Sequence, residues 1–582
     1  MLKLFRTYAI IMHNAVHILL KHQPERARLF GLEFFSPAGA LLFQRGASSP
    51  AILISILLLL LAACTPTPAV SPSPPTPPPA LPATATASPA PTETPQPTPI
   101  PTPTLPPVVG PEPSHRVAAF YYPWYKNPAV DGAWDHWEEP DFRPPLDISS
   151  DYYPLLGAYS ATDPAVVAQH FAWLRQAGVG VVIVSWWGQR TREERAVPVL
   201  LEMGQHYGIQ VAFHVEPYGG RTADRLVEDV QYLYAHYGDH PAFYRTTAST
   251  RWSQGDRSKG VFFVWLIERP DTQSQPVEAT YWREAVDAIH ALPDGGLVIA
   301  NTTRTDWVDG GHFDGLYNYA TLHLDEGEGF LWARALPPDT WYVPGVIPGF
   351  SARRIGYPDD TYVPRQDGAT YDEQWQAALG TGVEPALVSI TSFNEWHEGT
   401  QIEPAAAGAD NRLGYTYVDY GPLPPEGYLA LTRRWAEQFL ATAWPPTYRV
   451  RIRITTTSDW TTFGLVEGGI LLRPALVSAS PEATYAWLER GRFLLTQPIT
   501  RSEAGGTVEM VVDVLLTDVE EGKTLGFEIE RGHLGATQVV LSNYLGPEPV
   551  AVGTFEWGGI NPGERNAYPI QVPAAVLLDS SR

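Results

Sequence analysis

The sequence predicts an α/β fold, a TIM-like (β/α)8 barrel over residues 113–447, followed by an all-β, sandwich-like domain over residues 448–582. Strand-like apolar runs alternate with helical patterns along the first region, as expected for a parallel barrel covered by helices. After Pro445 and Pro446 the pattern changes to strands that alternate with period two. A doubly wound open sheet is the alternative for the first region, but no Gly-rich phosphate loop favours it.

Eight short runs rich in β-branched and aromatic residues predict the strands of the barrel. One strand per β/α unit is what a barrel of this class requires. The predicted strands are Val117–Tyr122, Val179–Trp186, Gln210–His214, Val261–Trp265, Leu297–Thr302, Gly315–Tyr319, Trp341–Val346 and Leu387–Asn394.

Helical patterns separate several of these runs. The clearest begins with Asp163 as N-cap and Pro164 at the first helical position, and it ends at Gly178. Two further helices are expected over Thr222–Tyr237 and Gly427–Ala441.

The C-terminal region contains the alternating runs Tyr448–Thr456, Thr507–Leu516 and Thr524–Ile529. Short strands separated by turn residues are typical of a β-sandwich. Such a domain could bind a glycan or brace the barrel, and we slightly favour the bracing role because no cluster of exposed aromatic residues is evident.

The composition narrows the class of partner. The net charge is −23, which argues against nucleic acid and anionic lipid as main partners because both require a basic surface. The chain has 19 Trp, 28 Tyr and 21 Phe, which fits either large cores or sugar binding through aromatic faces. No motif implies a metal or another cofactor.

The N-terminal region predicts export and a lipid anchor. Residues 1–63 are interpreted as an N-terminal extension and a signal peptide whose apolar segment is Ala51–Ala63. Leu61-Ala62-Ala63-Cys64 resembles a bacterial lipobox, in which the cysteine thiol is lipidated; an ordinary signal peptide is the alternative. Residues 64–112 are rich in Pro and Thr and predict an extended stalk. We therefore expect an exported, cell-surface lipoprotein held to the membrane at Cys64.

The active site of such a barrel lies at the C-terminal ends of its strands. These ends carry aromatic side chains together with His and Glu, which core packing alone does not explain. The candidate residues there are Tyr122, Tyr125, His136, Trp187, His214, Glu216, Tyr317, Tyr319 and Asn394.

Glu395 and Glu398 follow the last strand and can converge on one point, with Glu403 beyond them. Two carboxylates that handle protons between aromatic walls fit glycoside hydrolysis. The alternative is that one of them braces a loop through a salt bridge. A zinc-protease pattern would need a second His where Gln401 stands, and no GxSxG nucleophile motif is present.

At these residues the chain resembles glycoside hydrolase family 99, the endo-α-1,2-mannosidases and endo-α-1,2-mannanases. The resemblance covers roughly Arg116–Leu440 and is most specific over Ser389–Pro404. The segments that carry it are FYYPWY, DISSDYYPLLGAYSATDP, VIVSWWG, FHVEPYGGR, FDGLYNY, VSITSFNEWHEGTQIEP and LTRRWAEQF.

The resemblance implies a retaining, endo-acting enzyme that forms a 1,2-anhydro sugar. Glu395 would deprotonate the sugar 2-hydroxyl, and Glu398 would serve as general acid and then base. Six of the other candidates would hold hydroxyls around the reacting sugar: Tyr122, Tyr125, His214, Glu216, Tyr319 and Asn394. The loop after the seventh strand departs from the family pattern beyond Phe350, so the substrate contacts of Arg353 and Arg354 stay open.

Trp187 bears on the choice of substrate. Vertebrate members of the family tend to have SWY where this chain has SWW, the form of bacterial mannan-degrading members. We therefore expect cleavage of internal α-1,2 bonds in α-mannan or high-mannose N-glycans. The alternatives are release of glucosyl-mannose, another endo-glycanase such as an α-glucanase, or a non-catalytic glycan-capture lipoprotein.

Overall fold

The computed structural model describes residues 105–444, apart from 140, 323–328, 331, 334–335, 338 and 359–360, together with the backbone of eight strands between 447 and 570. The predicted signal peptide, Cys64 and residues 64–104 of the predicted stalk lie outside the described residues. Within the described part of the chain, no helix has the length and apolar character needed to cross a membrane.

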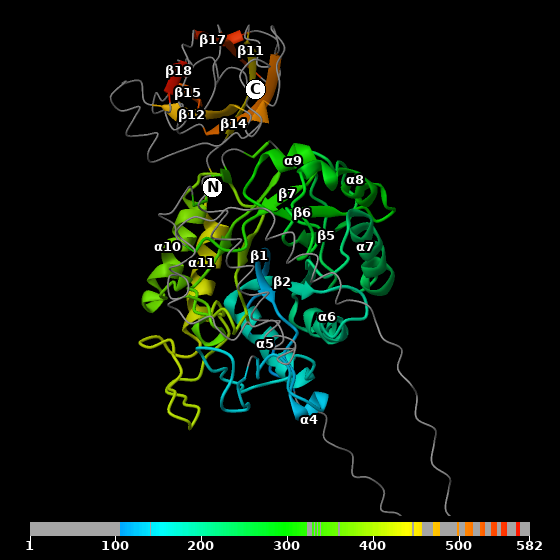
Figure 1. Cartoon of the computed structure of the whole chain (residues 1–582), viewed down its shortest axis with the longest axis vertical. Helices are drawn as coiled ribbons and strands as arrows, with labels where there is room; N and C mark the ends of the chain where they lie inside the picture. Colours follow the sequence, from blue (N-terminus) through cyan, green and yellow to red (C-terminus); the bar gives the residue numbers. More distant parts are fainter. Residues whose placement is uncertain are drawn as a thin grey trace, which may run out of the picture. The chain divides into compact units, whose positions relative to one another are not determined.

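A parallel sheet forms the centre of residues 114–441 and confirms the predicted barrel (Figure 1). Its strand order is β8-β7-β6-β5-β3-β2-β1-β10-β9, and a short antiparallel strand, β4 (Arg245–Thr246), is added to β5. The bounds are β1 Ser114–Tyr121, β2 Val179–Trp186, β3 Gln210–Val215, β5 Lys259–Val264, β6 Leu297–Asn301, β7 Gly315–Tyr317, β8 Trp341–Val343, β9 Gly345–Val346 and β10 Val388–Ile390.

One chain segment closes the barrel. The prediction of a single strand over Trp341–Val346 was wrong in detail, because its first half, β8, pairs with β7 and its second half, β9, pairs with β10. The strand divides at Pro344, whose carbonyl accepts a 2.9 Å hydrogen bond from Ser389 N. Gly345 N donates to the side chain of Asn318 at 3.1 Å. A Cβ at Gly345 would lie 2.0 Å from the Asn318 carbonyl oxygen, so only glycine fits at this junction.

Helices follow most of the strands and cover the barrel. The helix predicted after Asp163 is α5 (Pro164–Ala177), whose N-cap carboxylate accepts Ala165 N at 2.9 Å and which ends at Gly178 with φ +79°. The other two predicted helices are confirmed as well. The remaining bounds are α4 Pro128–Asp131, α6 Val197–Tyr207, α7 Ala223–Tyr237, α8 Arg283–Ala291, α9 Asp306–Gly311, α10 Ala369–Leu379 and α11 Gly427–Ala441.

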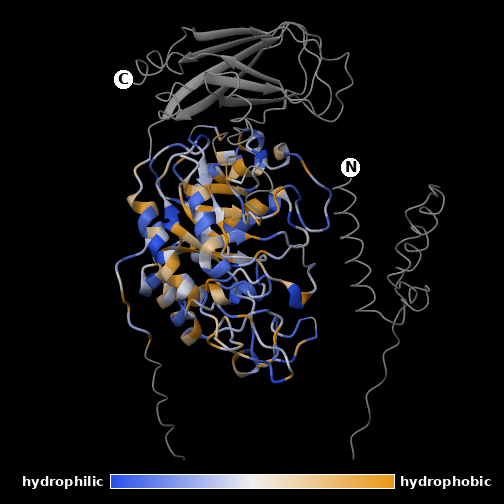
Figure 2. Cartoon of the chain, turned by 90° about the vertical axis from the view of Figure 1, so that its left-hand side faces the viewer, coloured by the Kyte–Doolittle hydropathy of each residue, from blue (hydrophilic) through white to orange (hydrophobic). Residues whose placement is uncertain are grey.

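The core lies between the strands and the inner faces of these helices. Every residue of β2 and β5 is buried, as expected for parallel strands covered on both faces. Figure 2 shows hydrophobic residues along the strands, whereas the helices are hydrophobic on one side and hydrophilic on the other. In α5 the buried residues include Val167, Phe171 and Leu174, which recur with the helical period and form its apolar face.

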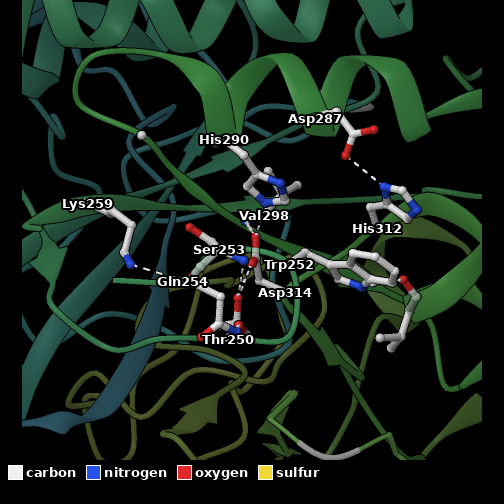
Figure 3. Close-up of polar contacts among 12 residues, drawn as sticks. Thr250, Trp252, Ser253, Gln254, Lys259, Asp287, His290, Val298, His312 and Asp314 are labelled. Carbon is white, nitrogen blue, oxygen red and sulfur yellow. Dashed lines mark hydrogen bonds and ion pairs between the residues drawn. The ribbon is translucent and has the colours of Figure 1, made fainter. Parts of the chain in front are cut away.

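A buried polar cluster occupies the N-terminal ends of β5, β6 and β7 (Figure 3). Asp314, which immediately precedes β7, is fully buried. It accepts hydrogen bonds from Val298 N and His290 Nε2, both at 2.8 Å, and from the Thr250 hydroxyl. The Lys259 ammonium is also buried and donates to the Gly255 carbonyl at 3.0 Å. These contacts tie the starts of three strands together at the end of the barrel that does not carry the predicted site.

Two four-stranded antiparallel sheets are described beyond residue 446. Their strand orders are β14-β11-β16-β17 and β13-β12-β15-β18. The two sheets agree with the predicted all-β region, and the sandwich arrangement stays a prediction. The strands are β11 Thr447–Thr456, β12 Ile470–Val477, β13 Pro498–Ile499, β14 Thr507–Leu515, β15 Thr524–Ile529, β16 Thr537–Asn543, β17 Pro549–Phe555 and β18 Asn566–Ile570.

Candidate active site

The C-terminal ends of β1, β2, β3, β7 and β10 carry most of the predicted site residues. Glu395 and Glu398 lie on the turn that follows β10, which ends at Ile390 and is therefore shorter than the predicted strand Leu387–Asn394. Glu395 is 3% exposed. A carboxylate pair at this end of a barrel lies where catalytic residues of the fold are found.

Backbone hydrogen bonds fix the turn around Glu395. Its own N–H donates to Ser392 Oγ at 2.7 Å, and His397 N donates to Glu395 Oε1 at 3.0 Å. Between the two glutamates, Trp396 N donates to the Tyr125 hydroxyl at 3.0 Å. Tyr125 is fully buried and its ring stacks on Trp137 with centroids 4.1 Å apart. This packing fixes the hydroxyl group to which the turn is hydrogen-bonded.

The two carboxyl groups form an electrostatically coupled pair. Burial, followed by the charge of Glu216, raises the pKa of Glu398 to about 7. Burial, followed by the charge of Glu398, raises the pKa of Glu395 well above its ordinary value, while N–H donation from His397 acts in the opposite direction. Two carboxyl groups that interact electrostatically and have little contact with water resist ionising together, so the pair holds a proton near neutral pH and can supply one acid and one base.

Glu216 belongs to a buried chain of hydrogen bonds that also includes His214 and Tyr317. His214 Nδ1 lies 2.9 Å from Glu216 Oε1, and His214 Nε2 lies 2.6 Å from the Tyr317 hydroxyl. The Ser185 hydroxyl donates to the same carboxylate at 2.8 Å and accepts from Trp187 Nε1 at 3.1 Å. Tyr317 therefore orients His214, and the indole N–H of Trp187 is already used within the protein.

Tyr122 and Tyr319 share a hydrogen bond between their hydroxyl groups. Burial is the main cause that raises the pKa of both phenols, and the charges of Glu395 and Glu398 add to it. The ring of Tyr319 also packs against Trp265, with centroids 4.7 Å apart. The two tyrosines thus border the carboxylate pair as neutral hydrogen-bonding groups.

Asn394 is fully buried and engaged within the protein. Its Oδ1 accepts Tyr122 N at 2.7 Å, and its Nδ2 donates to Tyr122 O at 3.0 Å. These bonds tie the turn after β10 to the end of β1. They indicate a positioning role, and the predicted contact of Asn394 with a sugar is untested.

His136 forms part of a wall beside the site. Its ring stacks on Trp124 with centroids 4.7 Å apart, and its carbonyl lies 2.6 Å from His397 Nε2. Burial and the adjacent Arg192 guanidinium lower the pKa of His136 to about 3, so the imidazole is neutral. With Asp135 and Glu139 it places three possible metal-ligand atoms within 4.8 Å of one another, but Asp135 is already paired with Arg192 at 2.5 Å.

The sequence did not indicate which buried residues support the turn that carries Glu395 and Glu398. Glu403 is fully buried, and its Oε2 accepts Trp396 Nε1 at 2.9 Å and the Tyr159 hydroxyl at 2.8 Å. Its Oε1 lies 3.1 Å from His170 Nε2, and His170 Nδ1 lies 2.9 Å from the Tyr121 hydroxyl. A histidine on the apolar face of the helix predicted after Asp163 was the available signal, but its partner lies 233 residues along the chain.

Arg353 and Arg354, whose substrate contacts the sequence does not decide, differ in how strongly they are bound to the rest of the protein. Arg354 donates to Asp147 Oδ1 at 2.5 Å and stacks over Tyr415 at 4.1 Å. Arg353 stacks over Tyr362 at 4.8 Å, and its side chain remains 44% exposed. Arg354 therefore braces its loop, whereas Arg353 has room for another contact.

Comparison with known proteins agrees with this chemistry. The family model described as "Glycosyl hydrolase family 99" matches residues 114–441. The chain is 35% identical over 361 residues to the "Glycoprotein endo-alpha-1,2-mannosidase" of Mus musculus, covering 55% of this chain and 74% of that protein. It is 34% identical over 357 residues to a "Glycoprotein endo-alpha-1,2-mannosidase-like protein" of Homo sapiens, covering 55% and 75%.

Solved structures are also similar. One is the GH99 endo-alpha-mannosidase from Bacteroides thetaiotaomicron, which is 32% identical with a TM-score of 0.48. The matched region covers 56% of this chain and 98% of that one.

Proposed function

The chain belongs to glycosyl hydrolase family 99 and is a glycoside hydrolase, and from this premise we propose that it cleaves internal α-1,2-mannosidic bonds of mannan or high-mannose glycans with retention of configuration. The single observation that carries the proposal is the electrostatically coupled pair of buried Glu395 and part-buried Glu398 at the C-terminal end of the barrel. Relatives named endo-alpha-1,2-mannosidases, matched over about three quarters of their length, support the choice of bond.

The proposed first step forms a 1,2-anhydro sugar. Glu395 takes the proton of the 2-hydroxyl, O2 bonds to C1, and the bond from C1 to the leaving oxygen breaks while Glu398 gives that oxygen its proton. In α-mannosides O2 is axial and trans to the leaving group, so it can attack in line from within the substrate. A nucleophile already attached to the reacting centre gains a high effective concentration.

The second step opens this intermediate with water. Glu398, now ionised, removes a proton from the water while the water oxygen bonds to C1. The C1–O2 bond breaks, and the proton held by Glu395 returns to O2. Two displacements at C1 leave the product with its original configuration. The proton balance requires one ionised and one protonated carboxyl group in the resting enzyme, the state favoured by the raised pKa values of the pair.

Two observations bear on this division of roles. Burial and the charge of Glu398 raise the pKa of Glu395, whereas the N–H of His397 donates to this carboxylate and favours the ionised form in which it serves as base. No side-chain hydrogen bond to the Glu398 carboxyl is described among residues 105–444, so its proton is free to face a substrate. The pKa of Glu398, about 7, suits an acid that works near neutral pH.

Trp187 supports packing on mannose rather than a polar contact. Its one polar group, the indole N–H, donates to Ser185 Oγ. The part-buried ring therefore offers only an apolar face to the sugar beyond the cleaved mannose. Release of a glucosyl-mannose unit is the second candidate, favoured by the glycoprotein endo-mannosidases among the relatives.

Product analysis on yeast α-mannan and on a glucosylated high-mannose N-glycan tests both candidates, with Glu398→Gln as the inactive control. We expect a mannose disaccharide from mannan, and a shift toward the glucosylated glycan in Trp187→Tyr. Glucosyl-mannose release by the wild type would replace the substrate assignment but keep the mechanism. Cleavage of neither glycan would contradict the proposal and favour another glycanase or glycan capture.

We also propose that the enzyme is an exported, cell-surface lipoprotein, with Cys64 as the lipidated residue and the Pro- and Thr-rich segment as its stalk. Expression in a bacterial host should place the wild type in the membrane fraction and labelled fatty acid on the protein. Cys64→Ser should remove the label. Labelling of the variant, or a wild type that carries none, would contradict the anchor.

A further inference from the structure

The loop between β9 and α10 is fastened directly to the turn that carries the carboxylate pair. Ser351 N donates to the backbone carbonyl of Glu398 at 2.7 Å. A Cβ at Gly399 would lie 2.6 Å from the Ser351 carbonyl oxygen, so the two backbones are in close contact. Phe350 and Val363 exchange two backbone hydrogen bonds of 2.9 Å, which join the two ends of the loop. We call residues 350–363 the β9 loop.

The tip of the β9 loop presents a tyrosine. A 3-10 turn, η6 (Arg353–Ile355), ends at Gly356 with φ +87°, and Tyr357 N then donates to Ala352 O at 3.2 Å. The Tyr357 side chain is 47% exposed, and its ring meets Phe350 edge to face at 6.0 Å. The backbone of Tyr357 is thus fixed by a hydrogen bond and its ring by the contact with Phe350, while about half of the residue stays exposed to solvent.

The hydroxyl of Tyr357 has no hydrogen-bond partner among residues 105–444 as described. Partial burial raises the pKa of Tyr357, and the charges of Glu398 and then Glu395 add to this effect. The phenol therefore lies within electrostatic reach of both carboxyl groups and stays a neutral donor. An exposed, unpaired phenol beside a sugar-cleaving pair has the apolar face and polar tip that a pyranose ring requires.

We propose that Tyr357 binds the sugar attached to the leaving oxygen and so sets specificity on the leaving side. The inference rests on the proposed function, because it takes Glu398 as the acid that protonates the leaving oxygen. A side chain on the loop fastened to Glu398 then faces the glycan that this oxygen carries.

Two substrates separate a leaving-side contact from a general defect. An α-1,2-linked mannan oligosaccharide carries sugars on the leaving side, whereas an α-mannobiosyl fluoride has only fluoride there. We expect Tyr357→Ala to lower kcat/KM on the oligosaccharide about tenfold, mainly through KM, and to leave kcat/KM on the fluoride unchanged. Tyr357→Phe should show a smaller loss, because the ring remains.

The matched control is Tyr362→Ala in the same loop, where the ring stacks on Arg353 and is 37% exposed. We expect near wild-type kinetics on both substrates. Equal losses in Tyr357→Ala and Tyr362→Ala, or a Tyr357→Ala loss that is the same on the fluoride, would overturn the inference. Wild-type kinetics of Tyr357→Ala on the oligosaccharide would overturn it too. A wild type that cleaves neither substrate would instead show that the proposed function is wrong, and the inference would fall with it.

Discussion

The indole N–H of Trp396 donates a 2.9 Å hydrogen bond to the buried carboxylate of Glu403. Trp396 is the middle of the turn between Glu395 and Glu398, so the position of both carboxyl groups depends on this bond. The same carboxylate accepts from Tyr159, whose hydroxyl also receives a 3.3 Å hydrogen bond from Asn394 Nδ2. One buried acid therefore supports the turn at two points.

Glu403→Gln should reduce activity although Glu403 touches no substrate. The amide replaces one acceptor oxygen with a donor, so a buried N–H or O–H loses its partner. We expect kcat to fall on the order of 10- to 100-fold with a smaller change in KM, since a displacement of about 1 Å can cost that much. Steady-state kinetics and circular dichroism check this. Glu373→Gln, at an exposed position of α10, is the control, and wild-type kcat in folded Glu403→Gln would refute the role.

The pH dependence of activity should report the shared proton of the carboxylate pair. As pH rises through about 7, the pKa of Glu398, this residue loses the proton that must pass to the leaving oxygen. We expect kcat/KM on mannan to fall about tenfold per pH unit on the alkaline side. Glu398→Gln should retain partial activity on the mannobiosyl fluoride without this alkaline limb. An unchanged alkaline limb in that variant would assign the proton to another group.

The same proton should make stability depend on pH. The raised pKa of Glu398 means that the folded state binds this proton more tightly than the unfolded chain, whose value is the ordinary 4.5. Stability from this group is therefore full below about 4.5 and is lost as pH rises through about 7. Glu398→Gln removes the buried charge, so its Tm should exceed that of the wild type at pH 8 and match it near pH 4.5. A lower Tm for the variant at pH 8 would contradict this sign.

The polar cluster at the N-terminal ends of the strands should affect stability alone (Figure 3). Asp314→Asn leaves one of its buried donors without an acceptor, which costs roughly 1–3 kcal/mol of unfolding free energy. We expect a lower Tm with unchanged kcat/KM at 25 °C. Asp287→Asn is the control, because that carboxylate pairs with His312 at 2.7 Å but is half exposed. A change in kcat/KM for folded Asp314→Asn would show that this end is coupled to the active site.

Local signals in the sequence were enough for most of the fold. The positions of β2 and of the three predicted helices are confirmed, because burial on both faces and capping residues such as Asp163 leave clear local patterns. The division at Pro344 was missed, since the choice between β7 and β10 as pairing partner depends on residues far along the chain.

The candidate site was predictable only in part, for the same reason. The two glutamates follow a strand and stand out by type and spacing. The bonds that occupy Asn394, and the placement of Glu403 against His170, exist only once β1, α5 and the turn after β10 come together. Tyr357 lies in a loop with no regular pattern, and only the contact between Ser351 and Glu398 places that loop beside the site.

The pairing of β1 with β10 has a consequence for biosynthesis. Val117 on β1 is in register with Val388 on β10, so the first strand of the barrel sheet to leave the ribosome waits for the last strand of that sheet. Until then β1 can pair with β2, but its other edge presents unsatisfied backbone groups to any neighbouring strand. The nascent chain therefore carries an open edge through the synthesis of about 270 residues, an interval in which aggregation or capture by a chaperone is favoured.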